Sequence, residues 1–325
     1  MSCTRAEISL LNDEHKKSDR YTALSSRENT NTDCRLVIEK LKSRIEDRLH
    51  ALLELGEYTP PRLVGAMRHA LLGGGKRFRP LLLVLSVPQD DHLDAAIDMG
   101  CAVEMVHTAS LILDDLPCMD DAQMRRDKQT THVVYGQATA ILAAISLLTR
   151  GMNVLSNLEG VPPHVRARLV AILSHAVGHT GLAAGQEIDL SDGTDLGVGV
   201  EEKNWLKTGR LFAAMAEMAS VLDNRSAERA AALSKFAFHV GSAFQALDDL
   251  LDTLATENAL GKDVRKDVGK SSMMSVNGET VTRHIYLDHL ESADLTLGRC
   301  GVDEEPIRLM LRSIEGLVPS GPLTV

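Results

Sequence analysis

Residues 93–113 read LDAAIDMGCAVEMVHTASLIL, and apolar side chains occupy almost every side of the helix that this stretch predicts. A surface helix keeps one polar face, so a helix that is apolar nearly all round is expected at the centre of a bundle. Ala, Leu and Met dominate the interiors of the other periodic segments, and alternation of apolar and polar residues is nearly absent. We therefore expect an all-α protein.

The helical pattern also divides the chain. Residues 1–34 are polar and rich in Ser, Thr, Asn and Asp, and we expect them to form a flexible N-terminal tail. Apolar residues recur at three- and four-residue spacing from Arg35 to Leu52, and residues 35–325 are expected to form a single domain. Further helices are predicted over about 91–116, 136–158, 163–190, 201–221, 227–255 and 303–317.

Composition narrows the classes of partner. Of the 325 residues, 45 are acidic and 35 basic, and the formal charge of −10 argues against binding to nucleic acid or anionic lipid. The five cysteines form no CxxC pair, which suits a reducing cytoplasm. No uninterrupted run of eighteen apolar residues predicts a membrane span, and no basic segment followed by a hydrophobic stretch predicts a secretory signal. An anionic ligand would need local cations or metal ions.

Two clusters of aspartates follow long apolar segments. The first reads DDLPCMDD over residues 114–121, and the second reads DDLLD over residues 248–252. Side chains four residues apart share a helix face, so the first and last aspartates of the second cluster should point the same way. In the first cluster, Pro117 should end the helix and bring Asp120 back towards Asp114.

Carboxylates that share a site repel one another unless cations neutralise them. Oxygen ligands of this kind suit Mg²⁺, which is commonly shared between carboxylates and substrate phosphates. Either cluster alone would be interpreted as a solvated helix end. The presence of both at the ends of apolar helices favours metal binding.

Basic clusters accompany the aspartates despite the acidic balance. They read GGGKRFRP over residues 73–80, RR at 125–126, KT at 207–208 and GKDVRKDVGKS over 261–271. The first places three cations after a glycine run, an arrangement suited to holding a diphosphate. The alternative for each cluster is an exposed surface loop. His175 and His179 are four residues apart, but without an HExxH glutamate we expect ordinary helix residues there.

Taken in order, these motifs resemble the trans-isoprenyl diphosphate synthase family, especially bacterial geranylgeranyl diphosphate synthases, over about residues 36–272. The resemblance implies an isoprenoid-synthase-type bundle of long helices around a deep central apolar cavity, usually as a homodimer. It implies Mg²⁺, about three ions per active site, and a prenyltransferase that condenses isopentenyl diphosphate with dimethylallyl, geranyl or farnesyl diphosphate. The implied products are geranylgeranyl diphosphate and pyrophosphate.

The same resemblance assigns roles by match of motif. The Mg²⁺ ligands, which with Lys207 form the catalytic set, would be Asp114, Asp115, Asp120, Asp248, Asp249 and Asp252. The diphosphate of isopentenyl diphosphate would be bound by Lys76, Arg79, His107 and Arg126. The allylic diphosphate would contact Arg125, Lys207, Thr208, Gln245 and Lys262.

Product length is expected to depend on the helix that leads to the first cluster. Ala109 and Ser110 precede Asp114 by five and four residues and are both small. In the family, bulky aromatic residues there stop growth at fifteen carbons, so this pair resembles a synthase that reaches twenty. Met105 and Val106, one turn further down, would form the cavity floor. Alternatively, Ala109 and Ser110 are small only so that helices pack closely.

Three alternatives stay open. A farnesyl diphosphate synthase belongs to the same family, and a terpene cyclase shares the first aspartate motif and the helical fold. A noncatalytic regulatory subunit of a synthase would be favoured by the loss of an aspartate motif, whereas both motifs are intact here. The aspartate-rich second cluster and only ten aromatic residues argue against a cyclase, which shields cations with aromatic rings. Asp127 departs from the glycine usual after the arginine pair, and its carboxylate is expected to compete for those arginines.

Overall fold

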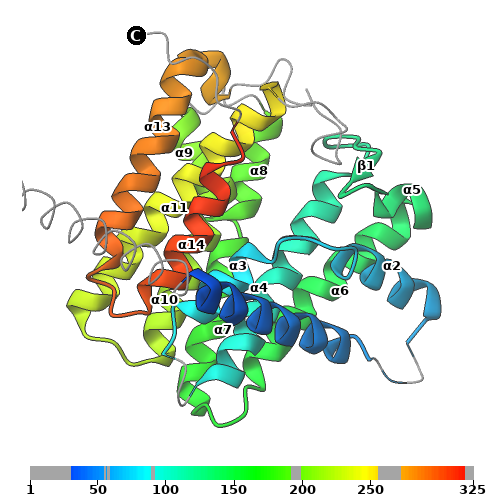
Figure 1. Ribbon diagram of the computed structural model, residues 1–325. Helices are drawn as coiled ribbons and strands as arrows, with labels where there is room; N and C mark the ends of the chain where they lie inside the picture. Colours follow the sequence, from blue (N-terminus) through cyan, green and yellow to red (C-terminus); the bar gives the residue numbers. More distant parts are fainter. Residues whose placement is uncertain are drawn as a thin grey trace, which may run out of the picture.

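A computed structural model describes residues 31–54, 56, 59–88, 92–191, 199–254 and 272–318. Within these ranges the chain is helical except for loops and one two-stranded ribbon of β1 (Met124–Arg125) and β2 (Lys128–Gln129) (Figure 1). The predicted all-α fold class is confirmed.

Helix α4 (Leu93–Asp114) is the central element, as its apolar composition predicts. Of its 22 residues, 14 are buried. It packs against α3 (Phe78–Leu85) and α6 (Gln137–Ser156), and it ends at the first aspartate cluster. Burial on nearly all sides explains why the sequence of this helix has no continuous polar face.

Helix α11 (Ala227–Leu254) carries the second aspartate cluster. It packs along α13 (Met273–Leu297) and α10 (Arg210–Leu222), and it contacts the π-helical turn η1 (Trp205–Gly209). The remaining helices are α2 (Pro61–Leu71), α5 (Thr131–Tyr135), α7 (Pro163–Val177), α8 (Leu182–Leu190), α9 (Val200–Asn204) and α14 (Glu304–Glu315).

The N-terminal helix covers residues 31–52, so helical structure already includes residues 31–34, which the sequence assigned to a tail. Residues 1–30 of the predicted tail lie outside the described residues. Arg77 holds this helix against the core, because its fully buried guanidinium forms ion pairs of 2.7 Å with Glu46 and with Glu104 of α4. Arg77 is therefore a structural cation and not part of a diphosphate cradle.

The predicted helices differ from the structure in two ways. The single helix predicted over 163–190 is interrupted between α7 and α8, where a Cβ on Gly181 would lie 1.9 Å from the carbonyl oxygen of Ala176. The short helices α2, α3 and α5 were not predicted, and neither was the long helix α13. Its sequence is largely polar with a kink at Gly278, and it is stabilised by packing on α11 rather than by a strong apolar pattern.

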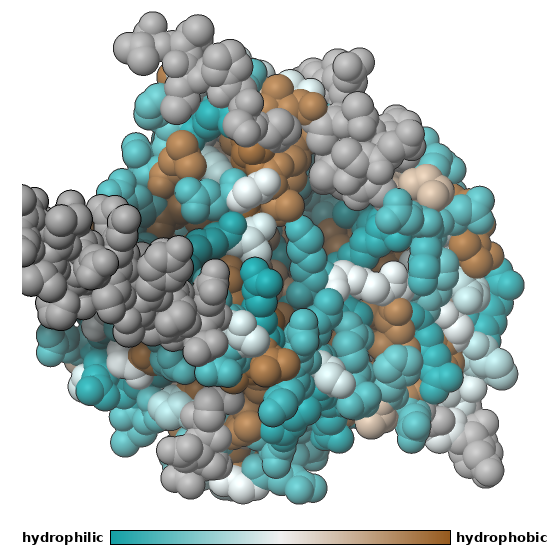
Figure 2. Space-filling model, viewed as in Figure 1, coloured by the Kyte–Doolittle hydropathy of each residue, from teal (hydrophilic) through white to brown (hydrophobic). Residues whose placement is uncertain are grey.

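In the part of the chain that the structure describes, two helices are long and apolar enough to cross a membrane by length and composition alone. They are α4, with 72% of its most apolar window buried, and α6, with 39% buried. Such helices are weak evidence for a membrane span, because the core helices of globular proteins have the same composition. On the face seen in Figure 2, hydrophilic side chains predominate and apolar ones form smaller patches between them.

Candidate active site

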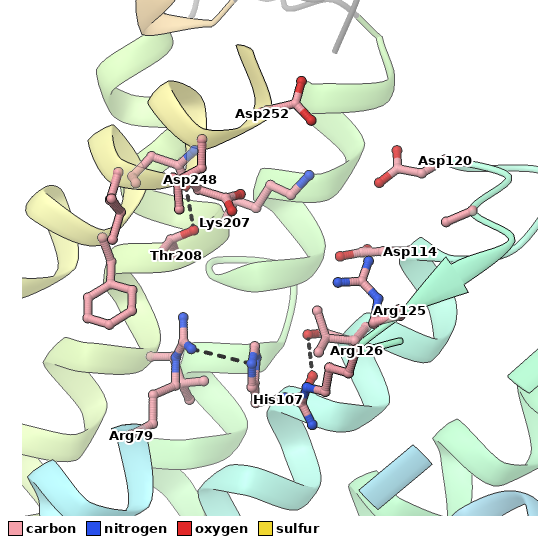
Figure 3. Close-up of a pocket in the computed structure, with 18 of the residues that line it drawn as sticks. Arg79, His107, Asp114, Asp120, Arg125, Arg126, Lys207, Thr208, Asp248 and Asp252 are labelled. Atoms are coloured by element: carbon pink, nitrogen blue, oxygen red, sulfur yellow. Dashed lines mark hydrogen bonds between the residues drawn. The ribbon is translucent and has the colours of Figure 1, made fainter. Parts of the chain in front are cut away.

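A polar cavity of about 420 Å³ lies between the end of α4, the ribbon, η1 and α11. Figure 3 shows acidic side chains on two sides of it and basic side chains around them. The residues predicted from sequence that line the cavity are Arg79, His107, Ser110, Asp114, Asp120, Arg125, Arg126, Lys207, Thr208, Gln245, Asp248 and Asp252.

The first aspartate cluster reaches the cavity because the chain turns back after α4. The helix ends at Asp114, and beyond Pro117 the backbone N–H of Asp120 donates a hydrogen bond of 2.9 Å to the Asp114 carbonyl oxygen. Both carboxylates line the cavity. The predicted break at Pro117 and the return of Asp120 towards Asp114 are confirmed.

The second cluster faces the first across the cavity. Asp248 and Asp252 lie one turn apart on α11 and both line the wall opposite Asp114 and Asp120 (Figure 3). Opposing carboxylates at the junction of two helices repel one another, and cations between them reduce this repulsion.

The second aspartate of each pair does not line the polar cavity. Asp115 is 4% exposed and forms an ion pair of 2.7 Å with Arg125. Asp249 is 5% exposed and accepts hydrogen bonds from Gln245 and from the backbone N–H of Met273. Successive helix residues point about 100° apart, so the two members of a pair cannot face the same wall.

Burial and charge shift the ionisation of groups in the cavity. Burial raises the pKa of Asp114 to about 6, an effect that nearby Asp120 strengthens and Lys207 opposes. Burial alone would lower the pKa of Lys207, but Asp114 and Asp189 outweigh it and the net pKa is raised. Lys207 is therefore a permanent cation held among carboxylates.

Lys207 and Thr208 are presented by the π-helical turn η1. Helix α8 approaches this turn so closely that a Cβ on Gly185 would lie 2.4 Å from the backbone nitrogen of Lys207. The close approach lets Asp189 of α8 accept from Lys207 and Lys203, each at 2.7 Å. Turns of this kind are frequent at functional sites.

Arg79 and His107 form a second basic group deeper in the cavity. The Arg79 guanidinium lies 4.8 Å from the ring centre of Phe212 and 5.6 Å from that of Phe244, and it donates to His107 Nε2 at 3.3 Å (Figure 3). Burial lowers the pKa of Arg79 to about 10 and, with Arg79 beside it, lowers that of His107 well below its usual range. His107 is thus neutral, with Nε2 as the acceptor.

Arg125 and Arg126 are placed by the β1–β2 ribbon. Its two-residue loop consists of Arg126 and Asp127, with φ of 54° and 60°, as in a type I′ turn. The need for positive φ explains why glycine is suited to position 127. Asp127 is exposed, and among the described residues no ion pair joins it to either arginine. The predicted competition for the arginines is therefore absent from this conformation.

Arg126 is anchored on the glycine run. It donates to the carbonyl oxygen of Gly74 at 2.7 Å, and its guanidinium would lie 3.0 Å from a Cβ on Gly75. The glycines thus permit a close approach of Arg126. Lys76 is exposed and is not among the residues that line the cavity. Lys262 lies outside the described residues.

An apolar cavity of about 250 Å³ adjoins the polar one. The two share Ser110, Asp114, Leu182 and Lys207 in their walls. Of the residues predicted to set product length, Ser110 and Val106 line the apolar cavity. Ala109 and Met105 are fully buried and are not among the lining residues of either cavity. Leu148 of α6 and Val177 of α7 also line this cavity.

Sequence reasoning missed several residues of the site. Asp189 and Lys203 are buried at 5% and 7% exposure and form a charged group with Lys207, whereas Phe212 and Phe244 hold Arg79. The sequence around Asp189, four residues after Gly185, does not indicate which side chains it contacts. These contacts depend on how α8 and η1 pack.

Within the described ranges, no three His, Cys, Asp or Glu side chains lie close enough to form a complete metal site by themselves. His175 contacts Thr180 through its ring nitrogens at 3.2 and 3.5 Å. The carboxylates of α4 and α11 nevertheless face one another across a space of ligand size. That geometry suits ions that complete their coordination with phosphate oxygens and water.

An all-α bundle in which opposed carboxylates and buried cations surround a cavity adjoining an apolar one defines a class of enzymes that act on diphosphate esters of hydrocarbons. The chain belongs to the polyprenyl synthetase family, whose profile matches residues 60–279.

Two curated relatives illustrate the similarity. The geranylgeranyl diphosphate synthase of Pantoea ananas is 42% identical over 263 residues, which cover 78% of this chain and 85% of the relative. The farnesyl diphosphate synthase of Geobacillus stearothermophilus is 36% identical over 274 residues, covering 79% and 91%. Both product classes are therefore represented among close relatives.

Solved structures share the fold. A geranyltransferase from Helicobacter pylori, complexed with magnesium and isoprenyl diphosphate, has a TM-score of 0.76 at 28% identity and covers 88% of this chain and 97% of its own. A geranyltransferase from Legionella pneumophila has a TM-score of 0.77 at 27% identity, covering 88% and 98%.

Proposed function

We propose that this protein is a Mg²⁺-dependent geranylgeranyl diphosphate synthase. The observation that carries the proposal is the junction of two cavities: carboxylates and cations surround the polar one, and the apolar one begins at Ser110 in their common wall. A diphosphate suits the first cavity and a growing hydrocarbon the second. The relatives from Pantoea ananas and Pseudescherichia vulneris, both geranylgeranyl diphosphate synthases, support this product.

The proposed Mg²⁺ ions would be held by Asp114 and Asp120 on one side and by Asp248 and Asp252 on the other. Bound there, they would neutralise the charge that develops on a departing diphosphate. The donor chemistry fits, because hard carboxylate oxygens occur on opposite walls and Mg²⁺ completes its shell with phosphate oxygens and water. About three ions per site would be consistent with this charge.

The cations divide into two groups that suit two diphosphates. Arg125 and Lys207 lie beside the carboxylates and are assigned to the allylic diphosphate. Arg79, His107 and Arg126 lie on the side of α3 and α4 and are assigned to isopentenyl diphosphate. The aromatic rings against Arg79 hold its guanidinium in a fixed place, which limits the loss of side-chain freedom on binding.

The proposed reaction needs no protein nucleophile. The allylic C–O bond breaks and its electron pair leaves with the diphosphate, which Arg125 and Lys207 stabilise. The double bond of isopentenyl diphosphate then attacks the allylic cation and forms the new C–C bond. A proton is lost from the adjacent carbon, and the released diphosphate, held in the same cavity, is its proposed acceptor.

The length of the product is assigned to Ser110 and Val106. Both line the apolar cavity on successive turns of α4, so larger side chains there would shorten it. Ala109 is assigned a packing role instead, because it is 0% exposed and absent from the lining of either cavity.

The quaternary state we propose is a homodimer in the cytoplasm. Support comes from an apolar face on α6, where Ile141, Leu142 and Ile145 are 40%, 55% and 51% exposed. A second copy that covers this face would remove the apolar surface from water. Sedimentation of the Ile145→Glu variant would test the dimer, since a charge there should yield monomers.

Product analysis tests the proposal directly. Purified protein is incubated with Mg²⁺, isopentenyl diphosphate and either geranyl or farnesyl diphosphate, with each substrate radiolabelled in turn, and the products are separated before and after phosphatase treatment. A twenty-carbon diphosphate is expected. Turnover of geranyl but not farnesyl diphosphate would identify a farnesyl diphosphate synthase, a cyclic hydrocarbon would identify a terpene cyclase, and no turnover would point to a noncatalytic subunit.

A further inference from the structure

We infer that Asp249 is a positioning residue that sets the hydrogen-bond direction of the Thr208 hydroxyl through Gln245, so that Thr208 offers lone pairs to the polar cavity. The group recognised there would be a hydrogen-bond donor, of which water bound to a divalent cation is the proposed example. The inference rests on the proposed function and deepens it, because it assigns a different role to one aspartate of the second cluster.

A continuous chain of hydrogen bonds connects η1 with the start of α13. The Thr208 hydroxyl donates to Gln245 Oε1 at 2.6 Å, and Gln245 Nε2 donates to Asp249 Oδ1 at 2.8 Å. The other oxygen of Asp249 accepts from the backbone N–H of Met273 at 2.7 Å. These hydrogen bonds thereby fix the positions of η1, α11 and α13 relative to one another.

Chemistry fixes the direction of every bond in this chain. The backbone N–H of Met273 can only donate, and a carboxylate can only accept. Met273 is the first residue of α13, and its N–H occupies one oxygen of Asp249 while Gln245 Nε2 occupies the other. Gln245 must therefore turn its NH₂ group to Asp249 and its oxygen to Thr208. Thr208, which has one proton, must donate it to that oxygen.

The consequence appears at the cavity wall, which Thr208 and Gln245 both line. With its proton directed at Gln245, the Thr208 oxygen has only lone pairs left for a ligand. Lone pairs repel the oxygens of a diphosphate but accept from water on a metal ion. The direct contact of Thr208 with the allylic diphosphate that the family resemblance implies is thus replaced by a contact with a donor.

Asp249 acts at a distance from the ligand. It is 5% exposed and is not among the residues that line the polar cavity, whereas Asp248 and Asp252 are. Its two oxygens instead accept hydrogen bonds from Gln245 and from the first N–H of α13.

The test uses Mn²⁺ as a paramagnetic probe with inorganic pyrophosphate, and free Mn²⁺ is measured by electron paramagnetic resonance. Asp249→Asn keeps an oxygen for Met273 but presents NH₂ to Gln245, which should rotate and turn its own NH₂ to Thr208. The Thr208 proton would then point into the cavity. We expect about fivefold weaker Mn²⁺ binding, as for the loss of one hydrogen bond.

A double-mutant cycle separates the indirect role from a direct one. Thr208→Val removes the hydroxyl, so Asp249→Asn should cause no further loss of Mn²⁺ affinity in that background. Asp248→Asn, the matched control on the cavity wall, should weaken binding by the same factor with or without Thr208→Val. Gln245→Met interrupts the chain without altering Asp249 and should repeat the result if Asp249→Asn folds poorly.

An undiminished effect of Asp249→Asn in the Thr208→Val background, with normal binding by the wild-type protein, would overturn the inference alone. Absence of Mn²⁺ binding by the wild-type protein with pyrophosphate would overturn the proposed function and the inference together. Thermal unfolding of each variant, followed by circular dichroism, verifies that the comparison is made between folded proteins.

Discussion

Lys207 Nζ lies 2.7 Å from Asp189 Oδ2, and this ion pair fixes the lysine that extends into the polar cavity between the two aspartate clusters. Lys203 binds the other oxygen of Asp189 at the same distance. Burial alone would raise the pKa of Asp189, but the two lysines outweigh it and hold the pKa well below its usual range. One buried carboxylate therefore supports two cations.

Removal of that carboxylate should destabilise the protein. Asp189→Asn removes the buried carboxylate that Lys203 and Lys207 share, and we expect a loss of about 3 kcal/mol in the free energy of unfolding. Urea denaturation measures the loss. Glu217→Gln is the matched control, since its ion pair with Arg168 is more than half exposed on both sides and should contribute less than about 1 kcal/mol. Equal effects of the two substitutions would contradict the role given to Asp189.

Product length should respond to Ser110 rather than to its neighbour. Ser110→Phe places a ring in the wall that the two cavities share, and the main product should shorten to fifteen carbons. Ala109→Phe should mainly destabilise the protein, because Ala109 is fully buried and a larger side chain overpacks the core by roughly 1–3 kcal/mol. Leu295→Phe, at a position of α13 that is 72% exposed, is the control. An unchanged product length in the Ser110→Phe variant would show that Ser110 does not limit the growth of the hydrocarbon.

Replacement of Asp127 by glycine should stabilise the turn of the ribbon. Its φ of 60° suits glycine, so Asp127→Gly should raise the free energy of unfolding by roughly 0.5–1 kcal/mol. Ser191→Gly is the opposite control, because its φ of −88° favours an ordinary residue and the substitution should lower stability. Differential scanning calorimetry compares the two. A decrease in melting temperature for Asp127→Gly would show that the aspartate side chain stabilises the turn by another route.

Stability should fall as the pH drops below about 6.5. The Nδ1 atoms of His239 on α11 and His289 on α13 are 3.0 Å apart, and burial lowers the pKa of both rings. Nearby Lys235 acts in the same direction on His239, whereas Asp288 and Glu201 oppose the shift of His289.

Because the unfolded chain takes up protons first, the free energy of unfolding declines through the window between the ordinary and the lowered pKa. Urea denaturation from pH 8 to pH 5 measures this decline. His289→Gln should flatten it, whereas the same slope in that variant would assign the pH dependence to other groups.

Much of the fold could be predicted from the sequence, because its physical causes lie in short stretches of the chain. The all-round apolar pattern of α4 predicts its central place, and Pro117 predicts the turn that returns Asp120 to the end of the helix. Helix α13 escaped prediction because its stability comes from packing on α11, and the break before α8 depends on the close approach of Gly181 to Ala176.

Part of the candidate site could likewise be predicted from the sequence, and part could not. The types and spacing of Asp114, Asp120, Asp248 and Asp252 indicated the polar cavity correctly, since their arrangement follows from helix geometry. The contacts of Asp115 with Arg125 and of Asp249 with Met273 could not be read from spacing, because these partners come from the ribbon and from α13. Asp189 was missed for the same reason, because its role depends on ion pairs with Lys203 and Lys207 from another segment.

The central claim is that opposed carboxylates hold a diphosphate through shared divalent ions. Crystals grown with Mn²⁺ and pyrophosphate, measured at the manganese absorption edge, test it most directly. The account predicts anomalous peaks between the Asp114–Asp120 side and the Asp248–Asp252 side, each in contact with pyrophosphate oxygens. Pyrophosphate bound in this cavity without manganese between the two helices, or manganese bound elsewhere, would contradict it.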